Sequence, residues 1–232
     1  MDIPVPFIPS SDCSLLVRIG DEISLDVHKR VSALTHSLLT HRLKPIRNLH
    51  PGYNSVLVSF DPLVASHSEL EEIIRNLLQQ DINVVRKSRT VEIPTCYGGE
   101  YGPDLDDVSK HCNLSHDEVI RIHSAVEYTV YFLGFSPGFP YLGDLPKQLV
   151  TPRLSIPRVK VPAGSVAIGG SQTGIYPVDS PGGWRIIGRT PTRLFQSDNE
   201  SPTLLQMGDV VRFKPITRKQ FEEIVEKEQM GG

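Results

Sequence analysis

Hydrophobic residues in the first part of the chain follow two spacings, one typical of strands and one typical of helices. Leu15, Val17 and Ile19 alternate with other side chains, which predicts a short strand. Two amphipathic helices are predicted where apolar residues recur with the 3.6-residue helical period. The apolar stripes are Val27, Val31, Leu34 and Leu38 in the first helix, and Leu70, Ile73, Ile74, Leu77 and Leu78 in the second.

Two strands are predicted between these helices, at residues 46–49 and 53–60, because the turn formers His50, Pro51 and Gly52 separate them. A capping box of Ser68 and Glu71 is expected to begin the second helix. The last strand is expected at Val84 and Val85, or in residues 90–96. This βαββαβ order predicts a ferredoxin-like sandwich for residues 1–89, with two helices on one face of a four-stranded sheet.

Residues 90–232 are predicted to form a second domain, because short strands and Gly/Pro turns replace amphipathic helices near Thr90. Capping residues predict a helix from Ser115 to Glu127 and a terminal helix after Thr217, and residues 104–113 can form a short helix. Strands at the spacing of a small barrel or sandwich are expected in residues 128–132, 160–161, 165–168, 174–176, 185–189 and 210–215. The predicted fold class is therefore α+β, with the β-rich domain in the second half.

Charge and composition exclude several classes of protein. The formal net charge is −3 and Lys and Arg are dispersed, so no nucleic-acid-binding surface is predicted. No apolar run reaches the roughly 18 residues of a membrane-spanning helix, and the N-terminus does not resemble a secretory signal, so a cytoplasmic location is expected. Three distant cysteines and histidines without ligand spacing predict neither a disulfide framework nor a metal site.

Candidate binding residues concentrate between Gly134 and Pro191, where more than half of the glycines and almost half of the prolines occur among aromatic residues. Backbone N–H groups left uncovered by glycine, beside an indole and arginines, favour a ligand-binding surface. The arginines suit a carboxylate or phosphate, but they could instead brace the barrel, and the aromatic rings could be core residues. The candidates are Tyr141, Arg153, Arg158, Ser165, Gln172, Tyr176, Ser180, Gly182, Gly183, Trp184 and Arg189.

A complete catalytic set is not found in the sequence. The glycine-rich residues 164–174 lack the Gly-Lys-Ser/Thr of a phosphate loop, and neither HExxH nor GxSxG occurs. His123 lies on the apolar face of its predicted helix, which is typical of a packed histidine, and it is a weak catalytic candidate.

Four ordered motifs resemble a known family. They are GFSPGFPYLG, PRLSIPRVKVPAGSV, GGSQTGIYP and SPGGWRIIGRTP, and they look like those of the B subunit of bacterial ATP-dependent 5-oxoprolinase. That family includes the Kip inhibitor of a sporulation histidine kinase and part of the carboxyltransferase region of urea carboxylases, once called allophanate hydrolase subunit 1. The resemblance implies a cyclophilin-like β-barrel for residues 90–232.

The resemblance implies two main functions and does not decide between them. In the first, the chain is an enzyme subunit that acts with a C subunit and ATP, with Mg²⁺ bound in the complex, to phosphorylate 5-oxo-L-proline. An A subunit then completes its hydrolysis to L-glutamate. In the second, the chain binds a sensor histidine kinase and blocks its autophosphorylation, which would require an exposed apolar surface. A prolyl isomerase is a weaker third possibility, because fold alone does not confer activity.

Overall fold

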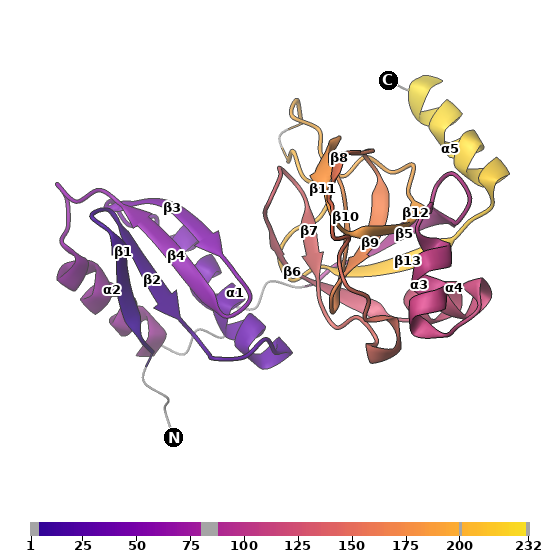
Figure 1. The fold of residues 1–232 in the computed structure, drawn as a ribbon. Coiled ribbons are helices and arrows are strands. Elements are labelled where there is room, and N and C mark those ends of the chain that lie inside the picture. The colour runs from indigo at the N-terminus through magenta and orange to yellow at the C-terminus, as the bar shows by residue number, and fades with distance from the viewer. Residues whose placement is uncertain (1–4, 80–87, 200, 231–232) are drawn as a thin grey trace. The chain divides into compact units, whose positions relative to one another are not determined.

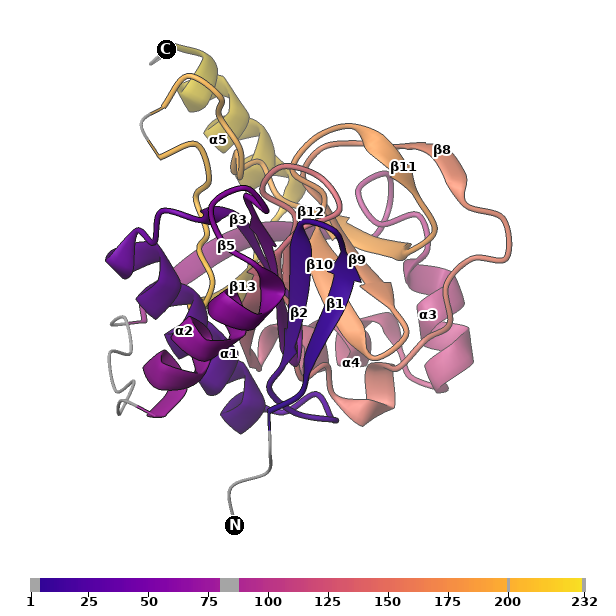
Figure 2. The ribbon, with the colours of Figure 1, turned by 90° about the vertical axis from the view of Figure 1, so that its left-hand side faces the viewer.

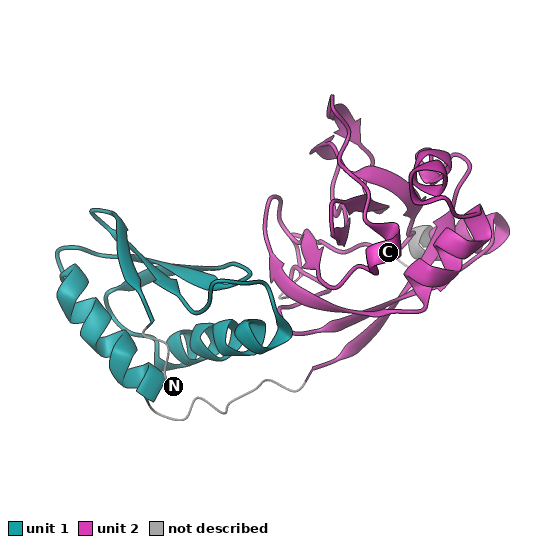
Figure 3. Ribbon diagram, turned by 60° about the horizontal axis from the view of Figure 1, so that its bottom comes forward, with its two compact units in different colours: residues 1–87 teal, residues 88–232 magenta. Residues whose placement is uncertain are grey.

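The computed structural model describes residues 5–79, 88–199 and 201–230, which belong to two compact units. Unit 1 comprises residues 1–87 and unit 2 residues 88–232 (Figure 3). The structure is mixed α+β, as predicted, and each unit has its own hydrophobic core. No helix in the described ranges combines the length and the apolar character needed to cross a bilayer.

Unit 1 is an antiparallel four-stranded sheet of order β1-β2-β4-β3 with two helices on one face (Figures 1 and 3). The strands are β1 (Phe7–Ser11), β2 (Ser14–Arg18), β3 (Ile46–Pro51) and β4 (Ser55–Phe60), and the helices are α1 (Leu25–His41) and α2 (His67–Gln79). Both predicted apolar stripes face the core, because Val31, Leu34, Leu70 and Ile74 are completely buried. The predicted helices and the strand pair between them are therefore confirmed.

Three details of the prediction for unit 1 differ. The hairpin partner β1 was not predicted, since Pro9 and polar residues leave its strand without an apolar alternation. The capping box of α2 uses Ser66 and Glu69, not Ser68 and Glu71: Ser66 Oγ accepts from the Glu69 N–H, and Glu69 accepts from the Ser66 N–H. Residues 90–96 do not supply the last strand of this sheet, and Val84 and Val85 lie outside the described residues.

Unit 2 contains a closed barrel of seven strands in the order β10-β7-β6-β13-β5-β12-β9 (Figure 1). Helices α3 (Leu105–Cys112), α4 (His116–Ser124) and α5 (Arg218–Met230) pack against β12, β13 and β5 respectively, and a 3₁₀ turn spans Lys147–Leu149. The predicted capping box of Ser115 and Glu118 is present. The barrel strands are β5 (Thr90–Tyr97), β6 (Glu127–Leu133), β7 (Pro140–Leu142), β9 (Ser165–Gly169), β10 (Gln172–Ile175), β12 (Arg185–Arg189) and β13 (Val210–Pro215).

Two strands of unit 2 lie outside the barrel, where they form a two-stranded sheet. They are β8 (Arg158–Val161) and β11 (Ser180–Gly182), and Figure 2 shows them standing clear of the barrel strands. The prediction that residues 160–161 form a barrel strand is therefore wrong. A strand prediction reports extended backbone, but it does not report which sheet the strand joins.

The wall of the barrel nearest this small sheet is buried on both faces. All five residues of β9 are buried. Val166 and Ile168 belong to the barrel core, whereas Ala167 belongs to a separate aromatic cluster outside the wall. A strand covered on both sides is expected to be continuously apolar, which explains the uninterrupted SVAIG sequence.

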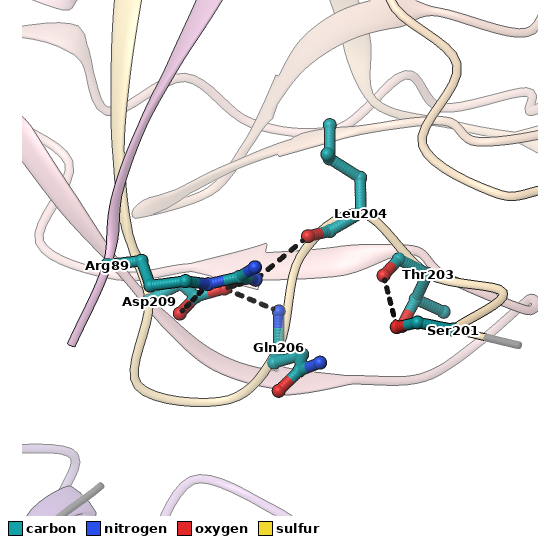
Figure 4. A network of polar contacts seen from close by, with 6 residues as sticks. All are labelled: Arg89, Ser201, Thr203, Leu204, Gln206 and Asp209. Carbon is teal, nitrogen blue, oxygen red and sulfur yellow. Dashed lines mark hydrogen bonds and ion pairs between the residues drawn. The ribbon is translucent and has the colours of Figure 1, made fainter. Parts of the chain in front are cut away.

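An ion pair fastens the two ends of the barrel together (Figure 4). Arg89, just before β5, donates to both carboxylate oxygens of Asp209 at 3.3 and 2.6 Å, and to the Leu204 carbonyl at 3.0 Å. The buried Asp209 also accepts from the Gln206 N–H at 2.9 Å. This contact brings β5 beside β13, with which it pairs in parallel.

We predict that residues 88–232 fold alone into a cooperative β-rich unit, because the barrel closes within them. A chain starting at Thr90 lacks the Arg89 ion pair and should be less stable, and one starting at Gly98 lacks β5 and should not fold. Circular dichroism and denaturant unfolding of the three fragments check this. Equal stability of the first two fragments would contradict the role given to Arg89.

Candidate functional site

A cleft of about 560 Å³ lies in unit 2 between the barrel wall and the β8–β11 sheet. Seven of the predicted site residues line it: Tyr141, Arg153, Tyr176, Ser180, Gly182, Gly183 and Trp184. Six more lining residues were not predicted: Phe135, Ser136, Phe139, Leu154, Pro157 and Pro181. Several of these belong to GFSPGFP, whose aromatic and turn residues were a usable signal.

Trp184 packs against the barrel wall because two glycines leave room for its indole. A Cβ atom on Gly169 would lie 2.5 Å from the ring, and one on Gly174 would lie 3.0 Å from it. Real side chains do not approach so closely, so the glycines of GGSQTG are required by the tryptophan of SPGGW. The two motifs are therefore two halves of one packing arrangement.

The aromatic rings around the cleft are fixed by edge-to-face contacts. The Phe139 ring lies 5.5 Å from Trp184 and 5.1 Å from Tyr176, with interplanar angles of 83° and 79°. The Tyr141 ring lies 6.1 Å from Trp184. Aromatic pairs favour this geometry over face-to-face stacking, so the cleft has a rigid apolar lining.

The Tyr176 hydroxyl reaches the SPGGW turn. A Cβ on Gly182 would lie 2.3 Å from the hydroxyl oxygen, so only glycine allows this approach. Burial raises the pKa of Tyr176, and the backbone N–H of Trp184, which the hydroxyl oxygen accepts, partly opposes that rise. Tyr176 is therefore a neutral phenol at physiological pH.

Arg153 is the cation of the cleft. Its guanidinium lies 5.6 Å from the centroid of the Trp184 ring, within the range of a cation–π contact. Within the described ranges, no carboxylate forms an ion pair with it. The segment that bears it is held by the Leu154 N–H, which donates to the Gly183 carbonyl at 2.7 Å. Arg153 can therefore bind an anion without losing an existing ion pair.

Arg158 and Arg189, the other predicted binding arginines, do not line this cleft. Arg158 donates to the buried carboxylate of Asp104 at 2.6 Å, and the second Asp104 oxygen accepts from the Ile186 N–H at 2.7 Å. Arg189, on β12, interacts electrostatically with Asp179. Arg158 thus fastens β8 to the barrel, as the bracing alternative expected.

Ser165 and Gln172 also lie apart from the cleft. Ser165 is completely buried and donates to the Pro162 carbonyl at 2.7 Å, which stabilises the turn before β9. Gln172 begins β10, where it pairs with Gly169. Their binding roles therefore stay predictions without a place in this cleft.

Two serine hydroxyls give the cleft unused hydrogen-bonding capacity. Ser136 Oγ and Ser180 Oγ are buried and have no hydrogen-bond partner in the described part of the chain. They come from the two sides of the cleft, one from the loop after β6 and one from β11. Because a buried polar group without a partner is destabilising, we attribute this arrangement to a ligand.

His123 occupies the barrel core and not the cleft. Thr173 Oγ1 donates to the Ala167 carbonyl and therefore accepts from His123 Nε2, so Nδ1 accepts from the Tyr97 hydroxyl at 2.8 Å. Burial lowers the pKa of His123 to about 3. A neutral imidazole with both nitrogens bonded favours a structural role, and its catalytic role stays untested.

No group of three or more His, Cys, Asp or Glu side chains in the described residues could hold a metal ion. The cleft thus combines an apolar lining, one available guanidinium and two hydroxyls. It has no nucleophile paired with a base among its lining residues. The arrangement suits the binding of a small anionic molecule better than unaided catalysis.

Comparisons with known proteins agree with the motifs. Residues 5–205 match the family model of the carboxyltransferase domain, subdomain C and D. The B subunit of 5-oxoprolinase from Bacillus subtilis (strain 168) is 40% identical over 230 residues, which cover 93% of this chain and 95% of that protein.

Two solved structures share the fold. The crystal structure of TTHA0988 has a TM-score of 0.78 and 35% identity over 88% of this chain, which spans only 39% of that longer chain. The K. lactis urea amidolyase has a TM-score of 0.77 over 96% of this chain and 15% of its own. At 23% identity it supports the fold alone.

We predict that Arg158→Ala destabilises unit 2 by about 2 kcal/mol, because it leaves the buried Asp104 carboxylate without its cation. Breaking a fully buried pair costs more, but the Arg158 side chain is 31% exposed. Arg153→Ala is the matched control and should change stability by less than about 0.5 kcal/mol. Chemical denaturation measures both, and equal effects would contradict the bracing role.

We predict that His123 makes stability depend on pH between about 3 and 6.5. Because its folded pKa lies below its unfolded value, the unfolded chain binds more protons in that window. The contribution is complete above pH 6.5 and is lost as the pH falls, by up to about 1.4 kcal/mol per pH unit.

The check is the pH dependence of the free energy of unfolding of His123→Gln, compared with the unaltered chain. The substitution should flatten the slope, whatever its effect at neutral pH. His28, whose pKa burial lowers to about 4, contributes equally to both proteins and cancels in the comparison.

Proposed function

Since the chain belongs to the family of carboxyltransferase subdomains C and D that includes the 5-oxoprolinase B subunits, we propose that it is the B subunit of an ATP-dependent 5-oxoprolinase. It is an enzyme subunit that does not act alone. Its partners in the proposal are a C subunit, with which it activates 5-oxo-L-proline, and an A subunit, which completes hydrolysis to L-glutamate.

The observation that carries the proposal is the unpaired guanidinium of Arg153 above the indole of Trp184. 5-Oxoproline has a single carboxylate on a small, largely apolar ring. A guanidinium binds both carboxylate oxygens at once, and the aromatic lining suits the ring. We therefore assign the cleft as the substrate site, with the carboxylate on Arg153.

The hydroxyls of Ser136 and Ser180 suit the lactam group in this proposal. A hydroxyl that accepts from the lactam N–H increases the electron density on the lactam oxygen. That oxygen is the atom to be phosphorylated, and phosphorylation converts an unreactive amide into an electrophile with a good leaving group. ATP, with Mg²⁺, is assigned to the complex and to no residue of this chain.

The proposal extends to the fold of each unit. The closed barrel of unit 2, with helices at its ends, supports the cyclophilin-like assignment. In unit 1, two helices on one face of a four-stranded antiparallel sheet support a ferredoxin-like relationship, although the described strands have the order β1-β2-β4-β3. Inhibition of a histidine kinase is not proposed, because the Bacillus subtilis relative is named as an oxoprolinase subunit and its similarity extends over 93% of this chain.

We predict that ATP-dependent conversion of 5-oxoproline to glutamate appears only when the chain is combined with C and A subunits. In that complex, Arg153→Ala should reduce kcat/KM roughly 10- to 150-fold, the loss of about 1.5 to 3 kcal/mol of charge-assisted hydrogen bonding. Arg153→Lys should rescue little, since a point charge cannot replace the planar fork.

The control is Arg121→Ala, at an exposed arginine on α4, which should leave turnover unchanged. Glutamate release and ATP consumption are measured together. Turnover by the highly purified chain alone would contradict the subunit assignment, whereas an unchanged kcat/KM for Arg153→Ala would contradict the substrate site only.

A further inference from the structure

The most exposed large apolar residues described in unit 2 lie around the cleft. Phe135, Ile156 and Val159 are 64%, 82% and 90% exposed. Phe135 lines the cleft, and Ile156 is flanked by Leu154 and Pro157, which also line it. We call Phe135, Ile156 and Val159 the cleft rim. A single exposed apolar residue is ordinary, but a group around a candidate site indicates an interaction surface.

The backbone of the rim is also incompletely satisfied. Val159 lies on β8, which pairs only with β11 in the described structure, so each strand keeps one open edge. An isolated two-stranded sheet is marginally stable, and its open edges offer N–H and C=O groups to another strand. Arg158, through Asp104, holds this sheet in place.

Phe135 is held out from the fold by its backbone. Its φ of 66° is in the left-handed region, which is unfavourable for a residue with a side chain. Its ring nevertheless contacts Phe139 at a centroid distance of 5.6 Å, at the mouth of the cleft. Strain of this kind is found where a side chain must be presented to a ligand or a partner.

We infer that the cleft rim is the docking surface for the partner C subunit, and that an extended segment of that subunit pairs with the open edge of β8 and packs on Ile156 and Val159. This inference rests on the proposed function. Pairing at a sheet edge supplies affinity through backbone hydrogen bonds, while the exposed side chains supply specificity. The docked segment would close the cleft and bring the catalytic groups that its lining residues lack.

The choice of occupant follows from the longer relative. This chain spans only 39% of the TTHA0988 chain, so the larger part of that polypeptide is tethered beside the same fold. In the present chain the corresponding region has to be supplied in trans. A surface that is apolar, lies at the cleft and has an open strand edge is where such a region would be needed.

The test compares the double variant Ile156→Asp, Val159→Asp with Leu63→Asp. Leu63 is 95% exposed but lies in unit 1, so it controls for removing an exposed apolar residue. Calorimetric titration with the purified C subunit should show the double variant binding at least about 30-fold more weakly, the loss typical of a hot spot. Leu63→Asp should bind like the unaltered chain, and neither protein should lose thermal stability.

A second measurement locates the contact directly. Hydrogen exchange should show the β8 amides becoming protected when the C subunit is added, while those of β1, an edge strand of unit 1, remain unchanged. Full affinity of the double variant, or protection confined to β1, would overturn the rim and leave the subunit assignment intact. Failure of the unaltered chain to bind the C subunit would overturn both. A dimer of this chain that the double variant disrupts would assign the rim to a second copy instead.

Discussion

The packing of Trp184 against two glycines is the contact on which the cleft depends. Without side chains at Gly169 and Gly174, the indole lies directly on the outer face of the barrel wall. Phe139 and Tyr141 are oriented by its edge, and Arg153 lies over its face. Interiors pack at crystal-like density, so a methyl group at either glycine would displace the whole arrangement.

Arginines in this region divide into those that hold the structure and one that is available. Arg158 and Arg185 reach Asp104 and Asp107, at the beginning of α3, and Arg185 also donates to the Pro152 carbonyl at 3.1 Å. The segment bearing Arg153 is thus tied down on both sides. A preorganised cation loses less entropy on binding than a free one, so the bracing arginines contribute to affinity without contacting the ligand.

Local patterns of the sequence predicted most elements, because they report local chemistry. The helical stripes, the Ser115 cap and the glycine-rich turns were all found in this way. The sequence did not indicate that β5 joins the barrel and not the first sheet, or that β8 leaves the barrel, because both depend on distant partners. Arg158 shows the same limit: its carboxylate partner is 54 residues away, so spacing could not distinguish a brace from a binding residue.

The parallel pairing of β5 with β13 has a consequence for the order of folding. The first and last strands of the barrel are neighbours, residues 90–97 and 210–215, so the barrel cannot close until nearly the entire chain has left the ribosome. Unit 1, whose described contacts are complete by Gln79, can fold earlier. During this interval the apolar strands of unit 2 are exposed without partners, a state prone to aggregation. Synthesis of this chain therefore has a long vulnerable period, and chaperones that shield nascent apolar strands would be needed most while residues 97 to 210 emerge.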